Sequence, residues 1–528
     1  MSSWSDFQLA LKRNGSFENY FSNWTRANFK PFWDFMGQFA VTSDFYLILL
    51  LKMNRKRLPR IPLMSCKSDF PTFETLYDES RTTYTRLLPR KKNYVDQLPP
   101  VEEVANLFRR RGKFVRETNR MSSVIFPYYA QWFTHQFFNT KQSPGQSAFT
   151  EVPVGFNLSQ LYGGPADENR LREHVGGRMR LEVVNGEEYP LLTDNPYQAY
   201  YPTKDGKVFD IGNMPFNFLP GVVAMQIIML RNHNRNAKLI SQAHPEMGDE
   251  ELFQKAKFVS LAQVLKVTME DYVNNHILSS HVRIRCRPQV VGSKMWNRKL
   301  PNFFPSNTIS MEFNILYRWH QLIPDTIKLV KNLDVKNPPK SLDGLAVDEI
   351  GPVADATMVR DRGVEVFLAS ASAQPAGKLT LFNTNDQIVD MVVLPGLKRL
   401  RELELASFND YRELFGLCRL TKFEEISDDP QIVEGLRKAY KNNIDLVEYY
   451  PGIYAEEKLW GGLHGGSLAL MGVSCTYSGI FSSRMLLPEA FTPEAFSPTG
   501  LKIVEETTLL SQLVGWNSNL KTVSFKAP

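Results

Sequence analysis

The nine residues EFNILYRWH, from Glu312 to His320, place a tyrosine three positions before a histidine. On a helix, positions i and i+3 share a face, so this spacing predicts that the Tyr317 side chain lies beside whatever His320 binds. A histidine can ligate haem iron, and a phenol held against the same macrocycle can pass one electron to an oxidised haem. If His320 is such a ligand, Tyr317 is placed to form a radical beside the haem, although the spacing by itself also fits a histidine and a tyrosine packed in the core.

A second histidine stands in AQWFTHQFF, residues 130–138. Gln131 precedes His135 by one helical turn and is expected on the same face. This pair suits the opposite side of a haem, where proton transfer helps to break a peroxide O–O bond. A single histidine in an aromatic-rich helix is more often a core residue. The prediction therefore rests on the two long motifs together.

Both motifs resemble those of the animal haem peroxidases and, within that superfamily, those of the cyclooxygenases, the prostaglandin-endoperoxide synthases. The resemblance continues in order along the chain at Phe32–Phe35, Tyr84–Pro89, Leu219–Gly221, Leu230–Arg235, Gln374–Gly377, Phe408–Arg412 and Tyr450–Gly452. It implies that His135 is the distal histidine, that His320 is the proximal iron ligand and that Tyr317 is the radical that attacks the substrate. It also implies one haem b per chain and a homodimer. His233, in the same series of motifs, is expected to form a structural hydrogen bond in the core.

The fold class expected from the sequence is mainly α. Apolar residues recur at helical spacing, without period-2 alternation, in Phe216–Leu239, Glu250–Leu278 and Ile309–Val330. The 32 prolines lie largely in connecting stretches and indicate many short helices. With the resemblance, this predicts a haem peroxidase-like single catalytic domain over residues 61–528, preceded by a tail over 1–16 and by membrane-binding helices over 17–60.

Residues 17–53 are rich in Phe, Tyr and Trp, and their longest apolar run is Phe45–Leu51. That run is far below the ~20 residues that a spanning helix needs. Short aromatic helices followed by Lys52, Arg55 and further cations are typical of helices that lie in one leaflet of a membrane. The alternative is an ordinary buried helical hairpin. The resemblance at Phe32–Phe35 favours monotopic attachment to an intracellular membrane, since Met1–Phe7 shows no secretory signal.

Charge and cysteine content exclude several other classes. The formal net charge is +6 and Arg109–Arg111 forms a basic cluster, yet no nucleic-acid-binding motif accompanies it, so no nucleic acid is expected as a partner. The four cysteines show neither metal-ligand spacing nor a dense disulfide framework. The cysteine-rich epidermal-growth-factor-like module of vertebrate-type cyclooxygenases is not seen in this sequence.

The resemblance also implies a fatty-acid channel. The arginine that pairs with the substrate carboxylate falls at Arg55, with Arg57 close enough to be confused with it, because a guanidinium offers a charged planar fork to a carboxylate. Further channel positions fall at Tyr272, Val273, Trp319, Thr476 and Gly479, and the tyrosine that assists the arginine is replaced by Ser280 or His281. Thr476 takes the place of the serine that aspirin acetylates, so slow or absent acetylation is expected.

Three other positions depart from the family pattern. Arg318 and Trp132 each replace a family histidine and are expected to retune the edge of the haem. Gln136 stands where calcium-dependent members of the superfamily have an aspartate ligand, so a structural calcium is not expected.

The activity implied by the resemblance is conversion of arachidonate-like polyunsaturated fatty acids, with two O2, to a prostaglandin endoperoxide, followed by peroxide reduction. A fatty-acid α-dioxygenase or another hydroperoxide-forming haem oxygenase would use the same histidines and tyrosine with a different placement of the substrate. Two further alternatives are a plain haem peroxidase, in which Tyr317 is a packed core phenol, and a non-catalytic membrane-bound binding protein.

Overall fold

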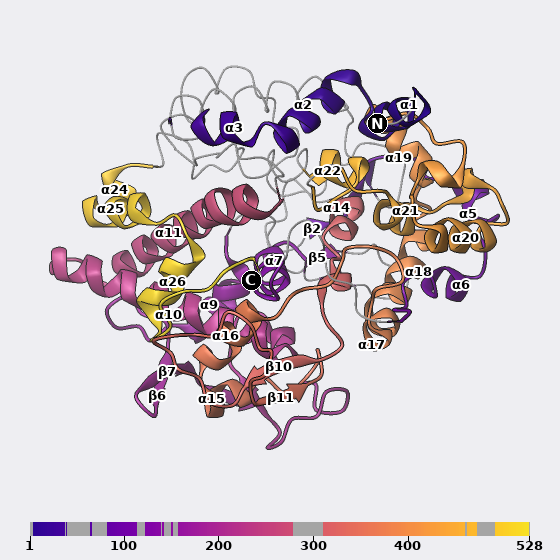
Figure 1. Ribbon diagram of the computed structural model, residues 1–528. Coiled ribbons are helices and arrows are strands. Elements are labelled where there is room, and N and C mark those ends of the chain that lie inside the picture. The colour runs from indigo at the N-terminus through magenta and orange to yellow at the C-terminus, as the bar shows by residue number, and fades with distance from the viewer. Residues whose placement is uncertain are drawn as a thin grey trace.

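The computed structural model describes residues 4–36, 39, 64–65, 82–112, 122–138, 140–141, 149–150, 157–277, 310–459, 462–472 and 491–526. Over these residues the chain is mainly helical, as predicted, and its helices surround α7 near the centre of the molecule (Figure 1). Within the described residues the strands are short and antiparallel: β1 (Met64–Ser65) with β3 (Thr85–Arg86), β2 (Thr82–Thr83) and β4 (Thr140–Lys141) on either side of β5 (Phe149–Thr150), β6 (Leu181–Val184) with β7 (Glu187–Pro190), β8 (Leu192–Asp194) with β9 (Lys207–Phe209), and β10 (Ile327–Val330) with β11 (Val347–Ile350).

The helices are mostly short, as the many prolines predict. In the first half of the chain they are α1 (Trp4–Asn14), α2 (Phe17–Asn28), α3 (Lys30–Met36), α5 (Lys92–Val95), α6 (Val101–Ala105), α7 (Ile125–Thr134), α8 (Ser159–Tyr162), α9 (Pro165–Leu171), η2 (Met214–Phe218), α10 (Pro220–Ala243) and α11 (Asp249–Val267), which continues as the π-helical η3 (Thr268–Ile277). In the second half they are α14 (Met311–Leu316), η4 (His320–Leu322), α15 (Met358–Arg362), α16 (Val364–Ala373), α17 (Asp386–Ile388), η5 (Val389–Val393), α18 (Leu394–Glu402), α19 (Phe408–Leu414), η6 (Phe423–Glu425), α20 (Pro430–Ala439), η7 (Ile444–Leu446), α21 (Tyr449–Ala455), α22 (Gly466–Gly472), α24 (Pro493–Phe496), α25 (Pro498–Glu506) and α26 (Leu510–Asn517).

The core is organised around α10, which packs against α7, α11, α16 and α26. Most of its residues are buried all round, so it is a central helix rather than an amphipathic surface helix. Gly221 lets α10 approach α7 closely, because a Cβ at that position would overlap the Tyr128 ring. Trp132 of α7 donates from Nε1 to Gln226 Oε1 of α10 at 2.6 Å. These contacts fix α7 against the centre of the fold.

The predicted helices at Phe216–Leu239 and Glu250–Leu278 are confirmed as far as residue 277. The prediction of one helix over Ile309–Val330 is wrong. α14 ends at Leu316, η4 is a single 3-10 turn, and the chain then enters β10.

The early end of α14 has a physical cause in its last carbonyl groups. The Tyr454 hydroxyl donates to Ile315 O at 2.9 Å and lies 3.1 Å from Leu316 O. The Trp319 indole also donates to Leu316 O, at 2.7 Å. Side chains therefore satisfy carbonyls that a longer helix would have used, and Tyr317 takes the C-cap position.

A buried carboxyl group holds α14 in place. Glu312 Oε1 accepts from the Leu87 backbone N–H at 2.9 Å and from the Tyr411 hydroxyl at 2.7 Å. Tyr449 donates to Glu312 O at 3.1 Å. Burial raises the pKa of Glu312, while these hydrogen bonds lower it. The helix that precedes Tyr317 is thus tied to α19 and α21.

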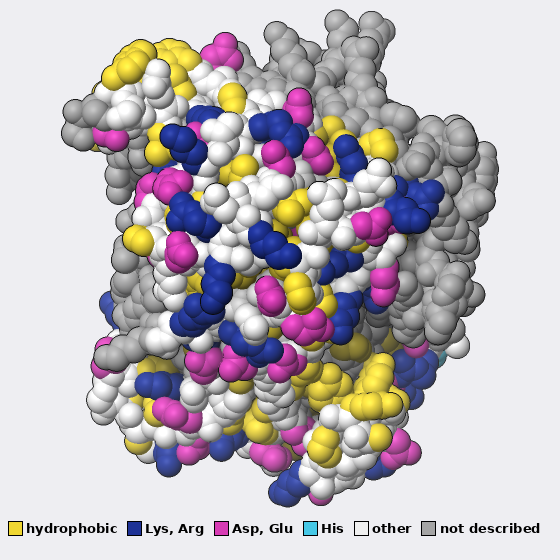
Figure 2. Space-filling model, turned by 90° about the vertical axis from the view of Figure 1, so that its right-hand side faces the viewer, with side chains coloured by type: hydrophobic (Ala, Val, Ile, Leu, Met, Phe, Trp, Pro, Cys, Tyr) yellow, Lys and Arg dark blue, Asp and Glu magenta, His cyan; other side chains and the backbone are white. Residues whose placement is uncertain are grey.

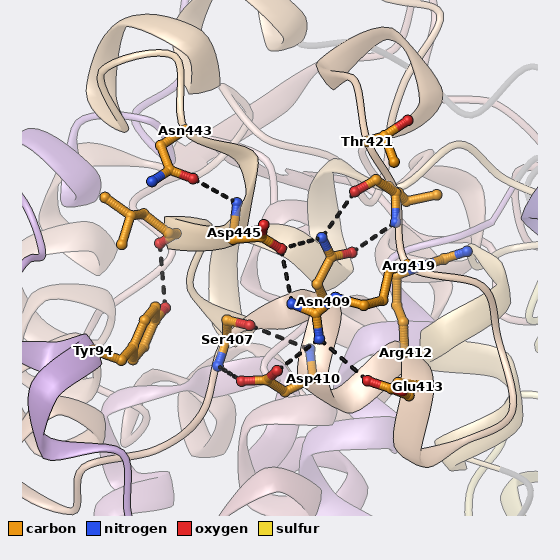
Figure 3. Close-up of polar contacts among 12 residues, drawn as sticks. Tyr94, Ser407, Asn409, Asp410, Arg412, Glu413, Arg419, Thr421, Asn443 and Asp445 are labelled. Carbon is orange, nitrogen blue, oxygen red and sulfur yellow. Dashed lines mark hydrogen bonds and ion pairs between the residues drawn. The ribbon is translucent and has the colours of Figure 1, made fainter.

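The motif Phe408–Arg412, which contributed to the family resemblance, begins α19 and has a structural role (Figure 3). Ser407 Oγ accepts from Asp410 N and Asp410 Oδ2 accepts from Ser407 N, both at 3.2 Å, which forms a capping box. Asn409 donates to Leu420 O and to Asp445 Oδ1, each at 2.9 Å. This network positions Tyr411, and through Tyr411 it positions Glu312.

The helices α1, α2 and α3 run along the upper edge of the molecule (Figure 1). Lys12 pairs with Glu425 at 2.6 Å and Arg13 pairs with Asp428 at 2.8 Å, which attaches α1 to the segment that contains η6. Aromatic side chains of α1–α3 are about half exposed or more: Trp4, Phe17, Phe21, Phe29, Phe32 and Phe35. In the described part of residues 17–53, these aromatic side chains are therefore not buried in the core. The described helices include none of the length and apolarity that a membrane crossing requires.

Two arginines of the basic cluster Arg109–Arg111 form ion pairs. Arg109 pairs with Asp390, and Arg110 pairs with Asp325. On the face shown in Figure 2, Lys and Arg side chains lie interspersed with Asp and Glu. Such a mixture lacks the one-sign stripe that nucleic-acid binding uses.

Candidate active site

A cavity of about 290 Å³ lies between the C-terminal end of α7 and the turn that follows α14. It brings together the two motifs that are nearly two hundred positions apart in the sequence. The described residues that line it are Pro127, Ala130, Gln131, Thr134, His135, Phe138, Asn314, Tyr317, Arg318, Trp319, His320, Ile323 and Val392. The predicted residues Gln131, His135, Tyr317, Trp319 and His320 therefore share one cavity.

On the α7 wall, the imidazole of His135 has a defined tautomer. Its Nδ1 lies 2.6 Å from Gln131 O, and a carbonyl oxygen can only accept, so Nδ1 carries the proton. Burial lowers the pKa of His135 to about 4, against the opposing effect of this hydrogen bond. His135 is therefore neutral near pH 7, with Nε2 unprotonated and able to accept a proton.

On the opposite wall, the imidazole of His320 makes no hydrogen bond with the described residues, and its Nδ1 is buried without a partner. Burial, with smaller contributions from Arg318 and His135, lowers its pKa to about 3. A neutral imidazole that lines a cavity and has no competing hydrogen bond is suited to ligate a metal. The two histidines are near enough for the charge of one to influence the other.

Tyr317 lies among aromatic rings. Its ring centroid is 5.3 Å from that of Phe313 and 5.0 Å from that of Trp319. The prediction that Tyr317 and His320 share a helix face is wrong, because α14 ends before both residues. The backbone turn nevertheless brings both side chains to the same cavity.

Arg318, between Tyr317 and Trp319, also lines the cavity. Its Nε and Nη2 donate to Asn314 Oδ1 at 3.3 and 3.1 Å, and its Nη1 donates to Val392 O at 3.0 Å. The sequence singled out Arg318 but missed both partners. Asn314 stands within the quoted motif, and Val392 belongs to the distant π-helical segment η5, where sequence gives no signal.

Other predicted positions lie away from the cavity or outside the described residues. Tyr272 and Val273 are buried, and the Tyr272 ring stacks on Phe126 with centroids 4.9 Å apart. Burial raises the pKa of Tyr272, and Tyr317 adds to the effect, so the two phenols are neighbours. The expectation that Trp132 adjusts the haem edge is wrong, because its side chain is fully buried against α10. The channel residues that fall outside the described residues are Arg55, Arg57, Ser280, His281, Thr476 and Gly479.

Two further residues have structural roles. His233 donates from Nε2 to Gly177 O and accepts at Nδ1 from the Tyr162 hydroxyl, both at 2.8 Å, which confirms the predicted core hydrogen bonding. Gln136 is fully buried, donates to Phe133 O at 2.8 Å and accepts from Leu158 N at 3.2 Å.

The donor set of the cavity fits a haem. One wall offers a neutral imidazole without a hydrogen-bonding partner, and the other offers an imidazole whose tautomer is fixed. Among the described lining residues there is no Asp or Glu, and Arg318 is the one side chain that carries a full charge near pH 7. A porphyrin, with an apolar ring and two carboxylates, matches this composition.

Sequence comparison connects the chain to enzymes of known activity. The model of the family "Animal haem peroxidase" matches residues 156–526. Prostaglandin G/H synthase 1 of Canis lupus familiaris is 28% identical over 512 residues, which cover 94% of this chain and 80% of that protein. Prostaglandin G/H synthase 2 of Bos taurus is 26% identical over 512 residues, with the same coverage.

Solved structures with the same fold include fatty acid alpha-dioxygenase of Oryza sativa, with a TM-score of 0.73 and 17% identity over 99% of this chain and 97% of that one. Peroxidase A of Dictyostelium discoideum has a TM-score of 0.66 and 17% identity, over 84% of this chain and 95% of that one. At such low identity these likenesses establish the fold alone.

Proposed function

The chain belongs to the animal haem peroxidase family, and on that premise we propose that it is a haem-dependent fatty-acid dioxygenase that also reduces peroxide. The predicted resemblance and the mainly α fold are confirmed, and membership of the family implies a haem cofactor. The observation that carries the proposal is the meeting of His135, Tyr317 and His320 at one cavity. A plain peroxidase needs the two histidines but has no use for a phenol between them.

His320 is the proposed iron ligand, with haem b as the proposed form of the cofactor. The low pKa of its imidazole keeps the nitrogen lone pair available at all pH values near neutrality. When bound, the haem supplies one-electron oxidising power after reaction with peroxide.

His135 is the proposed proton carrier for peroxide cleavage. Its unprotonated Nε2 would take the proton from one peroxide oxygen and return it to the other oxygen, the one that leaves. The carbonyl of Gln131 holds the ring in the tautomer that this transfer needs, and the Gln131 side chain offers an amide donor beside it.

Tyr317 is the proposed oxidant of the fatty acid. It would give one electron to the oxidised cofactor and release its phenolic proton to solvent, and the phenoxyl radical would take a hydrogen atom from a carbon of the substrate, which restores the phenol. O2 would then add to the carbon radical, and the peroxyl radical would take a hydrogen atom from Tyr317, which leaves a hydroperoxide and the phenoxyl radical for the next turnover. Trp319 and Phe313 pack on the phenol and keep its ring in a fixed position.

For the substrate, the prostaglandin G/H synthases support an arachidonate-like acid that takes up two O2 and cyclises. Tyr272 and Val273 would then stand near the reacting carbons. Arg318 favours the second candidate, a fatty-acid α-dioxygenase that forms a 2-hydroperoxy acid, because a cation beside Tyr317 places a carboxylate close to the radical.

Product analysis tests both candidates. The haem-reconstituted protein is incubated separately with arachidonate and palmitate, and the products are identified by mass spectrometry. A cyclised, doubly oxygenated product from arachidonate alone supports the synthase, and a 2-hydroperoxy acid from palmitate supports the α-dioxygenase. Tyr317→Phe should abolish either product while peroxidase turnover continues. Tyr129→Phe, which removes a phenol outside the cavity, should keep oxygenation. Equal products from Tyr317→Phe and the parent protein would refute the radical role.

We also propose that α2 and α3 attach the protein to one leaflet of a membrane, because Phe32 and Phe35 are exposed. The double change Phe32→Ser with Phe35→Ser should lower liposome binding by roughly tenfold or more. The control is Tyr200→Ser, which removes an exposed aromatic ring elsewhere. Flotation with anionic and neutral liposomes gives the result, and equal binding by both variants would contradict the proposal. A homodimer remains a proposal from the resemblance, and light scattering measures it.

A further inference from the structure

The guanidinium of Arg318 is half-buried and lines the cavity. Within the described residues it forms no ion pair with a carboxylate, and its hydrogen bonds go to an amide oxygen and a backbone carbonyl. Other buried or half-buried arginines do have such partners: Arg110, Arg172, Arg231, Arg401 and Arg412. A partly buried charge without a counter-ion is costly, so its presence at a cavity calls for a ligand.

The orientation of Arg318 is fixed from the protein side. Its Nε and Nη2 donate hydrogen bonds to Asn314 Oδ1, and its Nη1 donates a hydrogen bond to Val392 O. On another side, Gly396 leaves just enough room, because a Cβ there would come within 2.5 Å of Nη1. These contacts use three of the five N–H groups of the guanidinium, and the remainder of the group is left to the cavity.

A second cation strengthens the local positive potential. Arg399 of α18 is half-buried, and its Nε has no hydrogen-bonding partner. Burial lowers the pKa of Arg399, and the positive charge of Arg318 lowers it further, so the two guanidinium groups are neighbours, while Tyr84 and the Glu402 carboxylate raise that pKa by smaller amounts. Neither forms an ion pair with a carboxylate of the described residues. An anion bound at Arg318 would relieve this repulsion.

We propose that Arg318, held by Asn314 and Val392, is a carboxylate-binding site inside the cavity. A planar guanidinium with a fixed orientation binds a carboxylate through two parallel charge-assisted hydrogen bonds. The proposal rests on the proposed function, which supplies two sources of that chemistry. One is a propionate of the haem, and the other is the head group of the fatty acid, which would place carbon 2 beside Tyr317.

Two binding experiments on the full-length, haem-free protein separate these sources. In the porphyrin arm, the dissociation constants of metal-free protoporphyrin IX and its dimethyl ester are measured by fluorescence. In the fatty-acid arm, palmitate and methyl palmitate are compared by competition against a fluorescent fatty acid. In the arm whose carboxylate is the one that Arg318 binds, the unmodified protein should bind the acid roughly ten- to hundredfold more tightly than the ester.

Arg318→Gln should bring that acid-to-ester ratio close to one, and Arg318→Lys should retain part of it because a point charge replaces the fork. Arg399→Gln should have a smaller effect than Arg318→Gln, because Arg399 does not line the cavity. Thermal unfolding checks that each variant is folded, and the ester comparison on the unmodified protein needs no substitution.

If Arg318→Gln brings the acid-to-ester ratio close to one only in the porphyrin arm, the site binds a haem propionate. If the ratio falls only in the fatty-acid arm, the site binds the head group of the substrate. A fall in both arms describes a site that accepts either carboxylate. Ratios near one in both arms of the unmodified protein, or ratios that Arg318→Gln leaves unchanged, overturn the proposal. Neither arm uses iron, peroxide or turnover. A failure of the proposed oxygenation would appear in product analysis and would leave these ratios intact.

Discussion

The two walls of the cavity are built in different ways. The α7 wall is the last turn of a regular helix, and its histidine is anchored through Nδ1 to the carbonyl one turn earlier. The wall after α14 is an irregular turn, and the imidazole of His320 makes no hydrogen bond with the described residues. An anchored ring with one defined proton suits proton transfer, and a ring with a free nitrogen suits a metal ligand. The difference in backbone therefore agrees with the difference in the proposed roles.

The largest effect is expected from the wall after α14. His320→Ala removes the proposed iron ligand, so haem-dependent peroxidase turnover should fall to the background of free haem. Turnover is measured with a reducing dye after haem reconstitution. His174→Ala, which removes a histidine outside the cavity, is the control and should keep its turnover. Substantial activity in His320→Ala would remove the distinction between the walls.

A smaller loss is expected from the α7 wall. His135→Leu keeps the proposed iron ligand but removes the proton carrier, so the reaction with peroxide should slow by about 10²- to 10⁴-fold. Stopped-flow absorbance gives the rate, and the haem affinity should stay near that of the parent protein. Unchanged kinetics with peroxide would show that His135 transfers no proton.

Gln131→Leu sharpens the comparison within α7. The backbone carbonyl that orients His135 survives this change, and only the side-chain amide is lost. The rate with peroxide should therefore fall by about tenfold or less, the equivalent of one hydrogen bond. The same stopped-flow assay applies. A loss as large as that of His135→Leu would mean that the amide, and not the imidazole, carries the chemistry.

The smallest effect concerns acid stability of the haem-free protein. The pKa of His320 is lowered to about 3 and that of His135 to about 4, against an ordinary value near 6.5. The unfolded chain therefore binds more protons than the folded one from about pH 6.5 down to about pH 4 for His135 and about pH 3 for His320, and the stability conferred by these groups falls as the pH falls through that window. The melting temperature of the parent protein should drop more steeply from pH 7 to 5 than that of His320→Phe. Parallel curves would contradict the burial of a neutral imidazole.

The sequence predicted more of the α7 wall than of the other. Helical periodicity placed Gln131 and His135 correctly, because the helix persists to Thr134. The same periodicity failed for Tyr317 and His320, because the Trp319 indole and the distant Tyr454 hydroxyl bind the last carbonyl groups of α14, and hydrophobic spacing does not report such side-chain hydrogen bonds. The motif still identified the lining residues, because the short turn between α14 and η4 leaves both Tyr317 and His320 at the cavity.

Long-range partners could not be predicted from a local pattern. Val392 meets Arg318 from a segment 74 residues further along the chain. Trp132 was expected at the haem edge because it stands near His135 in sequence, yet its position on the helix directs it to Gln226 of α10. Both contacts depend on how distant helices pack against one another, and the local pattern of a single sequence does not predict that packing.

The central claim is that the two histidines have different roles, with His320 alone bound to iron. Resonance Raman spectroscopy of the ferrous haem-reconstituted protein measures the iron–histidine stretching band directly. The band should be present in the parent protein and in His135→Ala, and absent from His320→Ala. A band that persists in His320→Ala, or that disappears in His135→Ala, would contradict the assignment.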